Sequence, residues 1–168
     1  MVTVLVQIRR LGEKKRGENQ QFRQYLKRHN FVERRLRSIA QEIEEQIDCT
    51  QCANCCRVTE VGITERDIEK LTRFLGLTAE EFHRDFTQSN ESGHLILKRG
   101  PAGCVFLEGN LCGVYEARPQ NCANFPHIVR GSGSIDSRMW RIVDRAAYCP
   151  IVYNWMEKVK QDLGFTKL

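Results

Sequence analysis

Long hydrophobic runs and proline are both scarce in this sequence. The longest uncharged, apolar-rich stretch covers residues 1–8, well short of the ~20 residues that cross a bilayer. Arg9 and Arg10 follow this stretch, whereas a secretory signal carries its positive residues before the apolar run. With 4 prolines in 168 residues and 41% apolar residues, the composition also excludes collagen-like repeats and wholesale disorder. We therefore expect a cytoplasmic protein without a signal peptide or a membrane span.

Cysteine, by contrast, is plentiful and clustered. Four of the eight cysteines fall within eight residues, at Cys49, Cys52, Cys55 and Cys56, and the others are Cys104, Cys112, Cys122 and Cys149. Clustered thiols in a reducing compartment indicate metal ligands rather than disulfides. We predict that all eight bind metal. The alternatives are that some are buried as small hydrophobic residues or, in a secreted chain, paired as disulfides.

The spacing of the first four cysteines fits a thiolate metal site. Zinc takes four such ligands, and iron–sulfur clusters are also held by four cysteines. A Cys-x2-Cys step lets two sulfurs reach one metal, and this step occurs twice between Cys49 and Cys55. Cys56 directly follows Cys55, and adjacent side chains generally point apart, which favours a polynuclear centre or two neighbouring sites. The sequence leaves zinc and iron–sulfur open, with a slight preference for iron–sulfur.

Positive charge is concentrated near the N-terminus. Residues 9–37 hold 11 basic and three acidic residues, although the whole chain has a net charge of only +5. This segment predicts an acidic protein or nucleic-acid partner, and the alternative is a solvated helix face. Its aromatic residues are not interleaved as stacking platforms. Four arginines near the cysteines in sequence are candidates for neutralising thiolates: Arg57, Arg99, Arg118 and Arg130.

The hydrophobic pattern predicts mostly helices. In the N-terminal part we expect a short strand over residues 2–8, a loop over 12–17 and one long amphipathic helix over about 19–48. Further on, capping-box patterns predict helices over 65–75 and 79–86, and Pro150 begins a terminal helix that ends near residue 163. Strands are expected over 94–98 and 139–143, and a hairpin closed by residues 108–110 is expected to join 104–107 to 111–115. Residues 118–127 are expected to be irregular.

These elements predict a mainly α fold with a small β-hairpin or sheet (α+β), in one cysteine-rich, metal-centred domain with a long N-terminal helix. We expect three segments. Residues 1–17 form a strand and loop, residues 18–48 form the long basic helix, and residues 49–168 form the metal-binding domain.

The cysteine pattern resembles a known family. Cys-x2-Cys-x2-Cys-Cys, then Cys104-Val-Phe-Leu, then Cys112-Gly-Val-Tyr-Glu-Ala-Arg-Pro-Gln-Asn-Cys122 and Phe125-Pro126 is similar to the CxxCxxCC family of zinc- or iron-chelating domains. The resemblance covers about residues 49–126, with Cys149 as a further member, and implies metal binding through these cysteines. Ala123 departs from the family pattern, in which a basic residue is expected. A related cluster in flagellin lysine methylases keeps an enzymatic interpretation open.

Few other residues point to chemistry. His127, close to Cys122 in sequence, is a candidate ligand or a donor to a thiolate, whereas His29, His83 and His94 lack metal-like spacing. No nucleophile arrangement or phosphate loop occurs, so no catalytic residues are predicted. We expect a metal-binding protein with a structural, redox or metal-handling role. The alternatives are the metal module of a methyltransferase-like modifying enzyme and a zinc-dependent interaction module.

Overall fold

The computed structural model describes residues 1–166 and divides into two compact units. Unit 1 combines residues 1–48 with the segment from Phe125 onward, and unit 2 consists of residues 49–124. The sequence grouped the segment from residue 125 onward with the cysteine-rich region, but its side chains pack with residues 1–48 in one apolar core. Each unit has a separate hydrophobic core.

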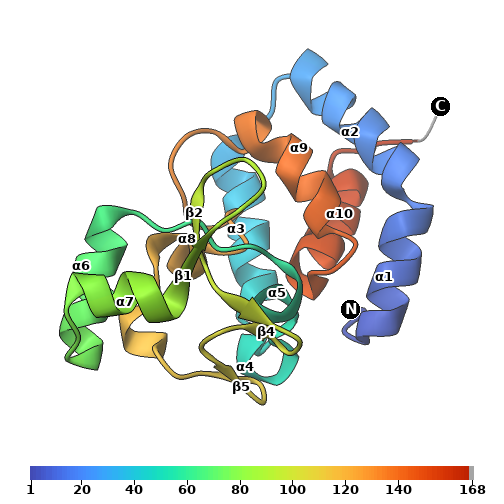
Figure 1. Ribbon diagram of the computed structural model, residues 1–168. Coiled ribbons are helices and arrows are strands. Elements are labelled where there is room, and N and C mark those ends of the chain that lie inside the picture. The colour runs from blue at the N-terminus through green and yellow to red at the C-terminus, as the bar shows by residue number, and fades with distance from the viewer. Residues whose placement is uncertain (167–168) are drawn as a thin grey trace. The chain divides into compact units, whose positions relative to one another are not determined.

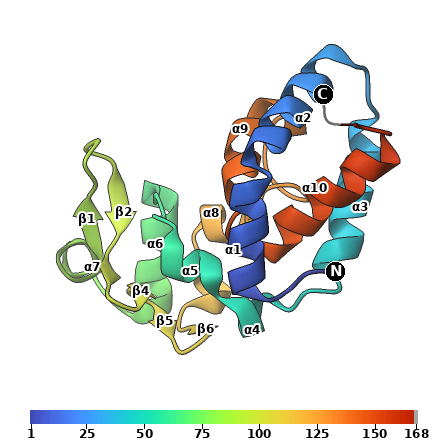
Figure 2. The ribbon, with the colours of Figure 1, turned by 90° about the vertical axis from the view of Figure 1, so that its right-hand side faces the viewer.

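Unit 1 is helical (Figures 1 and 2). Its helices are α1 (Leu5–Lys14), α2 (Arg16–Arg28), α3 (Glu33–Glu44), α9 (Ile135–Arg145) and α10 (Pro150–Asp162). Helix α10 packs on α3 and α2 packs on α9, so helices far apart in the sequence lie side by side. Trp155 of α10 is fully buried, and its indole N–H donates to the Leu36 carbonyl of α3 at 2.9 Å. The terminal helix predicted from Pro150 is confirmed.

The strand predicted over residues 2–8 is wrong, because helix α1 covers most of it. Ile8 and Gly12 are buried four residues apart, whereas Val4 and Val6 are exposed, as expected for one face of a helix. Gly12 allows a close approach, since a Cβ there would lie 2.5 Å from the Ala146 carbonyl oxygen. Within the described part of unit 1 there is no strand that residues 2–8 could pair with.

The single long helix predicted over about 19–48 is also wrong. Helix α2 ends at Arg28 and α3 begins at Glu33, with His29 and Val32 in extended conformations. The break spans four residues, which is close to one helical turn, so the three-to-four spacing of apolar residues continues across it. The buried side chains of both helices therefore look like one stripe in the sequence, although Val32 is exposed.

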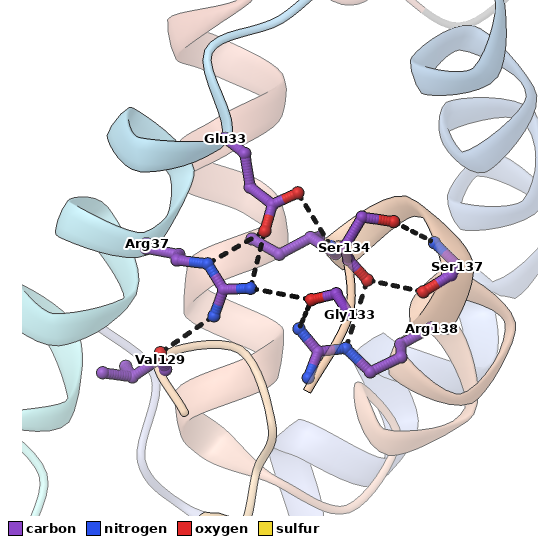
Figure 3. Close-up of polar contacts among 8 residues, drawn as sticks. Glu33, Arg37, Val129, Gly133, Ser134, Ser137 and Arg138 are labelled. Carbon is purple, nitrogen blue, oxygen red and sulfur yellow. Dashed lines mark hydrogen bonds and ion pairs between the residues drawn. The ribbon is translucent and has the colours of Figure 1, made fainter. Parts of the chain in front are cut away.

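Helix α9 replaces the strand predicted over 139–143. Ile135, Met139, Ile142 and Val143 are buried at helical spacing, and the Ser134 side chain accepts from the Ser137 N–H as an N-cap. The loop before α9 is held by arginines (Figure 3). Arg37 of α3 donates to the carbonyls of residues 129 and 133 at 3.0 Å each, and it pairs with Glu33. Arg138 of α9 also donates to the carbonyls of residues 133 and 134.

Unit 2 contains short helices and small strand pairs. Its helices are α4 (Cys49–Cys52), α5 (Asn54–Val58), α6 (Glu65–Leu75), α7 (Ala79–Phe86), the 3₁₀ turn η1 (Tyr115–Ala117) and α8 (Gln120–Asn124). The two predicted capping boxes are confirmed, with Thr64 and Asp67 at α6 and Thr78 and Glu81 at α7. Gly76 ends α6 in the left-handed conformation, at φ 70°. Helix α8 corrects the prediction that residues 118–127 are irregular throughout.

The strands of unit 2 form three antiparallel pairs. They are β1 (Thr87–Ser89) with β2 (Leu95–Leu97), β3 (Arg99–Gly100) with β4 (Gly103–Cys104), and β5 (Leu107–Glu108) with β6 (Leu111–Cys112). The predicted hairpin exists but is shorter, with Glu108 paired to Leu111 around a Gly109–Asn110 turn. Cys104 lies outside that hairpin and pairs with Arg99 instead.

The structure confirms a mainly α fold with small antiparallel β elements. Among the residues that the structure describes, no helix combines the length and apolar character needed to cross a membrane.

Candidate metal centre

Seven of the eight cysteines lie in unit 2, on five different elements. Cys49 and Cys52 are on α4, Cys55 and Cys56 on α5, Cys104 on β4, Cys112 on β6 and Cys122 on α8. Several of these elements are only two to five residues long. Such segments have little regular hydrogen bonding of their own, so other contacts must position the thiols.

The CxxCxxCC segment is bent at its centre. Ala53, between α4 and α5, has φ 46° and ψ 14°, in the left-handed region that residues with a Cβ rarely adopt. Its N–H still donates to the Cys49 carbonyl at 2.9 Å. Because the chain turns here, a continuous helix does not hold Cys49, Cys52 and Cys56 on one face. The bend separates the first two cysteines from the adjacent pair.

The adjacent pair does not diverge as the sequence suggested. The Sγ atoms of Cys55 and Cys56 are 4.0 Å apart. Four sulfurs placed tetrahedrally at ~2.3 Å around zinc would be about 3.8 Å from one another. This separation is therefore compatible with two ligands of one metal atom, as well as with ligands of neighbouring atoms in a cluster.

Gly103 brings β4 against α5. A Cβ on Gly103 would lie 2.6 Å from the Cys56 carbonyl oxygen and 2.7 Å from the Arg57 Cα, and the residue has φ 120°. Only glycine fits such a contact with backbone atoms in this conformation. The contact places Cys104, the next residue, beside the CxxCxxCC segment.

Arg57 and Asn110 connect the β5–β6 turn to α4. The Arg57 guanidinium donates to the Cys52 carbonyl at 3.0 Å and to the Gly109 carbonyl at 2.8 Å. The Asn110 amide donates to the Gln51 carbonyl at 3.0 Å. These bonds fix the turn that precedes Cys112 against the backbone of the Cys-x2-Cys step.

Hydrogen bonds to Asp67 position the helix that carries Cys122. The buried Asp67 carboxylate accepts from the Gln120 N–H at 2.8 Å, at the first residue of α8. Its other oxygen accepts from Thr64 in the α6 capping box. The Asn121 side chain also donates to the Gly62 carbonyl at 2.9 Å. Together these bonds attach α8, and therefore Cys122, to α6 and the segment before it.

Four of the thiols lie within electrostatic reach of one another. Burial, together with the charges of Cys104, Cys56 and Cys112, raises the pKa of Cys122 to about 12. Burial also raises the pKa of Cys104 and of Cys112, and in both cases the Cys56 charge adds to the effect. Collecting several thiolates at one place is unfavourable without a cation to neutralise them.

Cys56 is the exception. A hydrogen bond with the Cys55 thiol and the charges of Arg57 and Arg118 together lower the pKa of Cys56 to about 6, against the effect of burial. The Arg118 charge also opposes the rise in the pKa of Cys112 and of Cys122. Arginine charge therefore favours the thiolate forms, as metal binding requires.

The predicted compensating arginines divide between the units. Arg57, Arg99 and Arg118 are in unit 2, and each lowers the pKa of at least one cysteine. Arg130 is in unit 1, where it forms an ion pair with Glu44.

The donor set suits a thiophilic metal, since four cysteines from four elements are gathered beside three arginines. Over residues 1–166, no three His, Cys, Asp or Glu side chains are arranged to hold a metal ion together. The elements thus bring the thiols into one region without forming a closed coordination shell.

Cys149 and His127 belong to unit 1. Cys149 is buried in the apolar core, directly before α10, and its carbonyl accepts from the Tyr153 N–H at 3.0 Å. His127 has φ 66°, on the loop that leads to α9. Metal ligation by either residue remains a prediction.

The sequence did not identify Gly103, Asn110 or Asp67 as site residues. The capping box predicted one task of Asp67, but its contact with α8 spans 53 positions and has no local signal. Gly103 and Asn110 looked like ordinary turn residues, because their partners are on a distant segment.

No solved structure matches this chain. A family model described as "CxxCxxCC: Putative zinc- or iron-chelating domain" matches residues 48–150, more than half of the sequence. The match spans all eight cysteines, including the seven that unit 2 contains. The chain therefore belongs to the CxxCxxCC family of zinc- or iron-chelating domains.

Proposed function

We propose that unit 2 holds an iron–sulfur cluster through its cysteine thiolates, with a structural, redox or metal-handling role. The proposed ligands of this cluster come from the seven cysteines of unit 2. Cys149 of unit 1 is proposed separately as a metal ligand. The observation that carries this proposal is the gathering of Cys56, Cys104, Cys112 and Cys122 from four elements into mutual electrostatic reach. Family membership supports zinc or iron as the metal.

The number of thiols favours a cluster over a single ion. One zinc ion uses four ligands, whereas unit 2 supplies seven cysteines within 76 residues. Adjacent thiols such as Cys55 and Cys56 can serve different iron atoms of one cluster.

Anaerobic purification with elemental analysis and a visible spectrum tests the proposal. We expect brown protein that contains iron and acid-labile sulfide, and Cys104→Ser or Cys122→Ser should lower the iron content. Ser89→Ala, on the neighbouring β-pair, is the control and should retain it. Colourless protein with stoichiometric zinc and no iron uptake on anaerobic reconstitution would reject the cluster but retain thiolate metal binding.

Zinc is the second candidate, and one distance favours it. The 4.0 Å between the Cys55 and Cys56 sulfurs is close to the ligand separation in a tetrahedral zinc site. For zinc, Cys55→Ser and Cys56→Ser should each weaken binding of the same ion. For a cluster, the two variants should change its spectrum differently.

We also propose that the protein works in the reducing cytoplasm, where clustered thiols remain available to metal. Protein purified with reductant should have the mass of the fully reduced chain after metal removal. Four intramolecular disulfides in protein taken directly from cells would contradict this location.

The proposed acidic partner of residues 9–37 has a smaller surface than the sequence suggested. Five of the 11 basic side chains form ion pairs within unit 1: Arg9, Lys15, Arg16, Arg35 and Arg37. The exposed Arg10 and Lys14 of α1, Lys27 and Arg28 of α2 and Arg34 of α3 form no ion pair within residues 1–166. We propose that these five residues contribute most to binding an acidic partner.

A further inference from the structure

The two units differ strongly in charge. Unit 1 contains 18 Lys and Arg against 11 Asp and Glu, a net charge of +7, and unit 2 contains 8 against 10, a net charge of −2. The net positive charge of unit 1 is larger than that of residues 1–48 alone, because the segment from Phe125 onward adds seven basic and four acidic residues. Unit 1 is therefore the part of the molecule that attracts anions.

An exposed tryptophan lies on this unit. Trp140 of α9 is 48% exposed, whereas Trp155, the other tryptophan, is 0% exposed. The Arg141 guanidinium lies 4.7 Å from the centre of the Trp140 ring. An indole with an arginine beside it offers a flat apolar surface next to positive charge.

The fold places this tryptophan beside the basic helix α2. Helices α2 and α9 pack together (Figure 2). Arg16 of α2 forms an ion pair with Asp144 of α9 at 2.5 Å. Asp144 is four residues from Trp140, so the two side chains share one face of α9. The aromatic residues of the basic segment are not interleaved as stacking platforms, and a helix more than 100 residues away thus supplies an exposed ring.

We propose that Trp140, with Arg141 and the basic side chains of α2, binds single-stranded nucleic acid. Unpaired bases expose the flat faces that stack on indole, and arginine and lysine contact the phosphates between them. An acidic protein would complement the charge of unit 1 but would leave the half-exposed indole without a matching group. This inference rests on the proposed partner binding by the basic helices, and it names the partner and the stacking residue.

The experiment uses the full chain and a fluorescein-labelled single-stranded oligonucleotide of mixed sequence, followed by anisotropy at low salt. We expect saturable binding that weakens with salt, and about 10-fold weaker binding for Trp140→Ala. Arg141→Gln should lower the slope of log affinity against log salt by about 1. Because Trp155 is buried, an unlabelled oligonucleotide should quench only the Trp140 emission.

The matched control is Phe74→Ala. Phe74 is 49% exposed on α6 of the acidic unit 2, so its loss removes a similar exposed ring from the other unit. We expect Phe74→Ala to bind as the unchanged protein does, and both variants should keep their melting temperatures.

Three results would overturn the inference: no binding at low salt, equal affinity for a duplex of the same sequence, or full affinity in Trp140→Ala. In the last case, the proposal of an acidic partner would still stand if binding depended on salt and were lost on neutralising the five basic residues. These are Arg10, Lys14, Lys27, Arg28 and Arg34. If polyglutamate displaced the oligonucleotide from the unchanged protein and quenched the Trp140 emission to the same extent, the partner would be an acidic protein instead. Metal-free and metal-loaded protein should bind alike, so this test is independent of the cluster.

Discussion

A single glycine sets the distance between two cysteine-bearing elements. The backbone of Gly103 lies so close to Cys56 and Arg57 that no side chain fits between them. The three nearest atoms that a Cβ would meet all belong to the backbone, so no side-chain rotation relieves the clash.

We therefore predict that Gly103→Ala lowers the free energy of unfolding by about 2–3 kcal/mol, through the clash and the strain at φ 120°. It should also lower the metal content, because β4 moves away from α5. Gly109→Ala is the matched control, since Gly109 has φ 61° with no atom within 4 Å of the added Cβ. Chemical denaturation and elemental analysis measure both effects, and equal losses in the two variants would contradict the close-contact explanation.

The half-buried Cys122 thiol leads to a second prediction at the residue scale, for the metal-free protein. Folding raises its pKa from 9.0 to about 12, so between these values the folded chain binds more protons than the unfolded chain. Stability must then fall as the pH rises above 9, by up to about 1.4 kcal/mol per pH unit from this group. Urea titrations under reductant at pH 8, 9 and 10 should show a smaller fall for Cys122→Ser, and parallel curves would refute the effect.

At the scale of elements, helices with capping boxes and regular apolar spacing were predicted well. The segments without such local signals take conformations that depend on packing against residues far away in the sequence. Helices α6 and α7 carry capping boxes and regular apolar spacing within their own residues, and both were correct. The segments 2–8 and 139–143 are short apolar runs whose pattern fits a strand or a helix. Both are helical because one helical face of each packs against buried side chains of unit 1. The break at residues 29–32 keeps the helical spacing and was therefore invisible in the sequence.

The two capping boxes allow a matched test of how α8 is positioned. Asp67→Ala removes both the α6 cap and the anchor of Gln120, whereas Glu81→Ala removes only the α7 cap. We expect about 1 kcal/mol of destabilisation for Glu81→Ala and about 2–4 kcal/mol for Asp67→Ala, because Asp67 is buried and its loss removes the hydrogen bonds to both Thr64 and Gln120. Only Asp67→Ala should lower metal content, and similar losses of metal in both would refute the anchoring task.

At the scale of the whole molecule, the cysteine motif identified the family but not how the chain divides. The motif is contiguous enough to recognise by spacing, whereas the joining of residues 1–48 with the segment from 125 onward depends on contacts across 100 or more positions. The positioning bonds of Asn110 and Asp67 have the same long-range origin.

The separate cores predict that metal loss acts unequally on the two units. Unit 1 has a large core that includes Phe22, Leu36, Met139 and Trp155, whereas unit 2 has a smaller core and its cysteine-bearing helices and strands are short. Chelation, or Cys52→Ser, should lower the melting temperature by many degrees. Hydrogen exchange should then show lost protection within residues 49–124 and retained protection in α3 and α10. An unchanged melting curve after complete metal loss would contradict this prediction.

The joining of two distant segments in unit 1 also fixes the order in which the molecule can form during synthesis. All residues of unit 2 have been made once Asn124 is added, whereas α9 and α10 are still untranslated. At ~5–20 residues per second, the remaining 44 residues take several seconds to make. During that interval the apolar faces of α2 and α3 lack their partners, whereas the chain of unit 2 is already made. Unit 2 can thus begin to fold, and to take up the metal proposed for it, before unit 1 can complete its core.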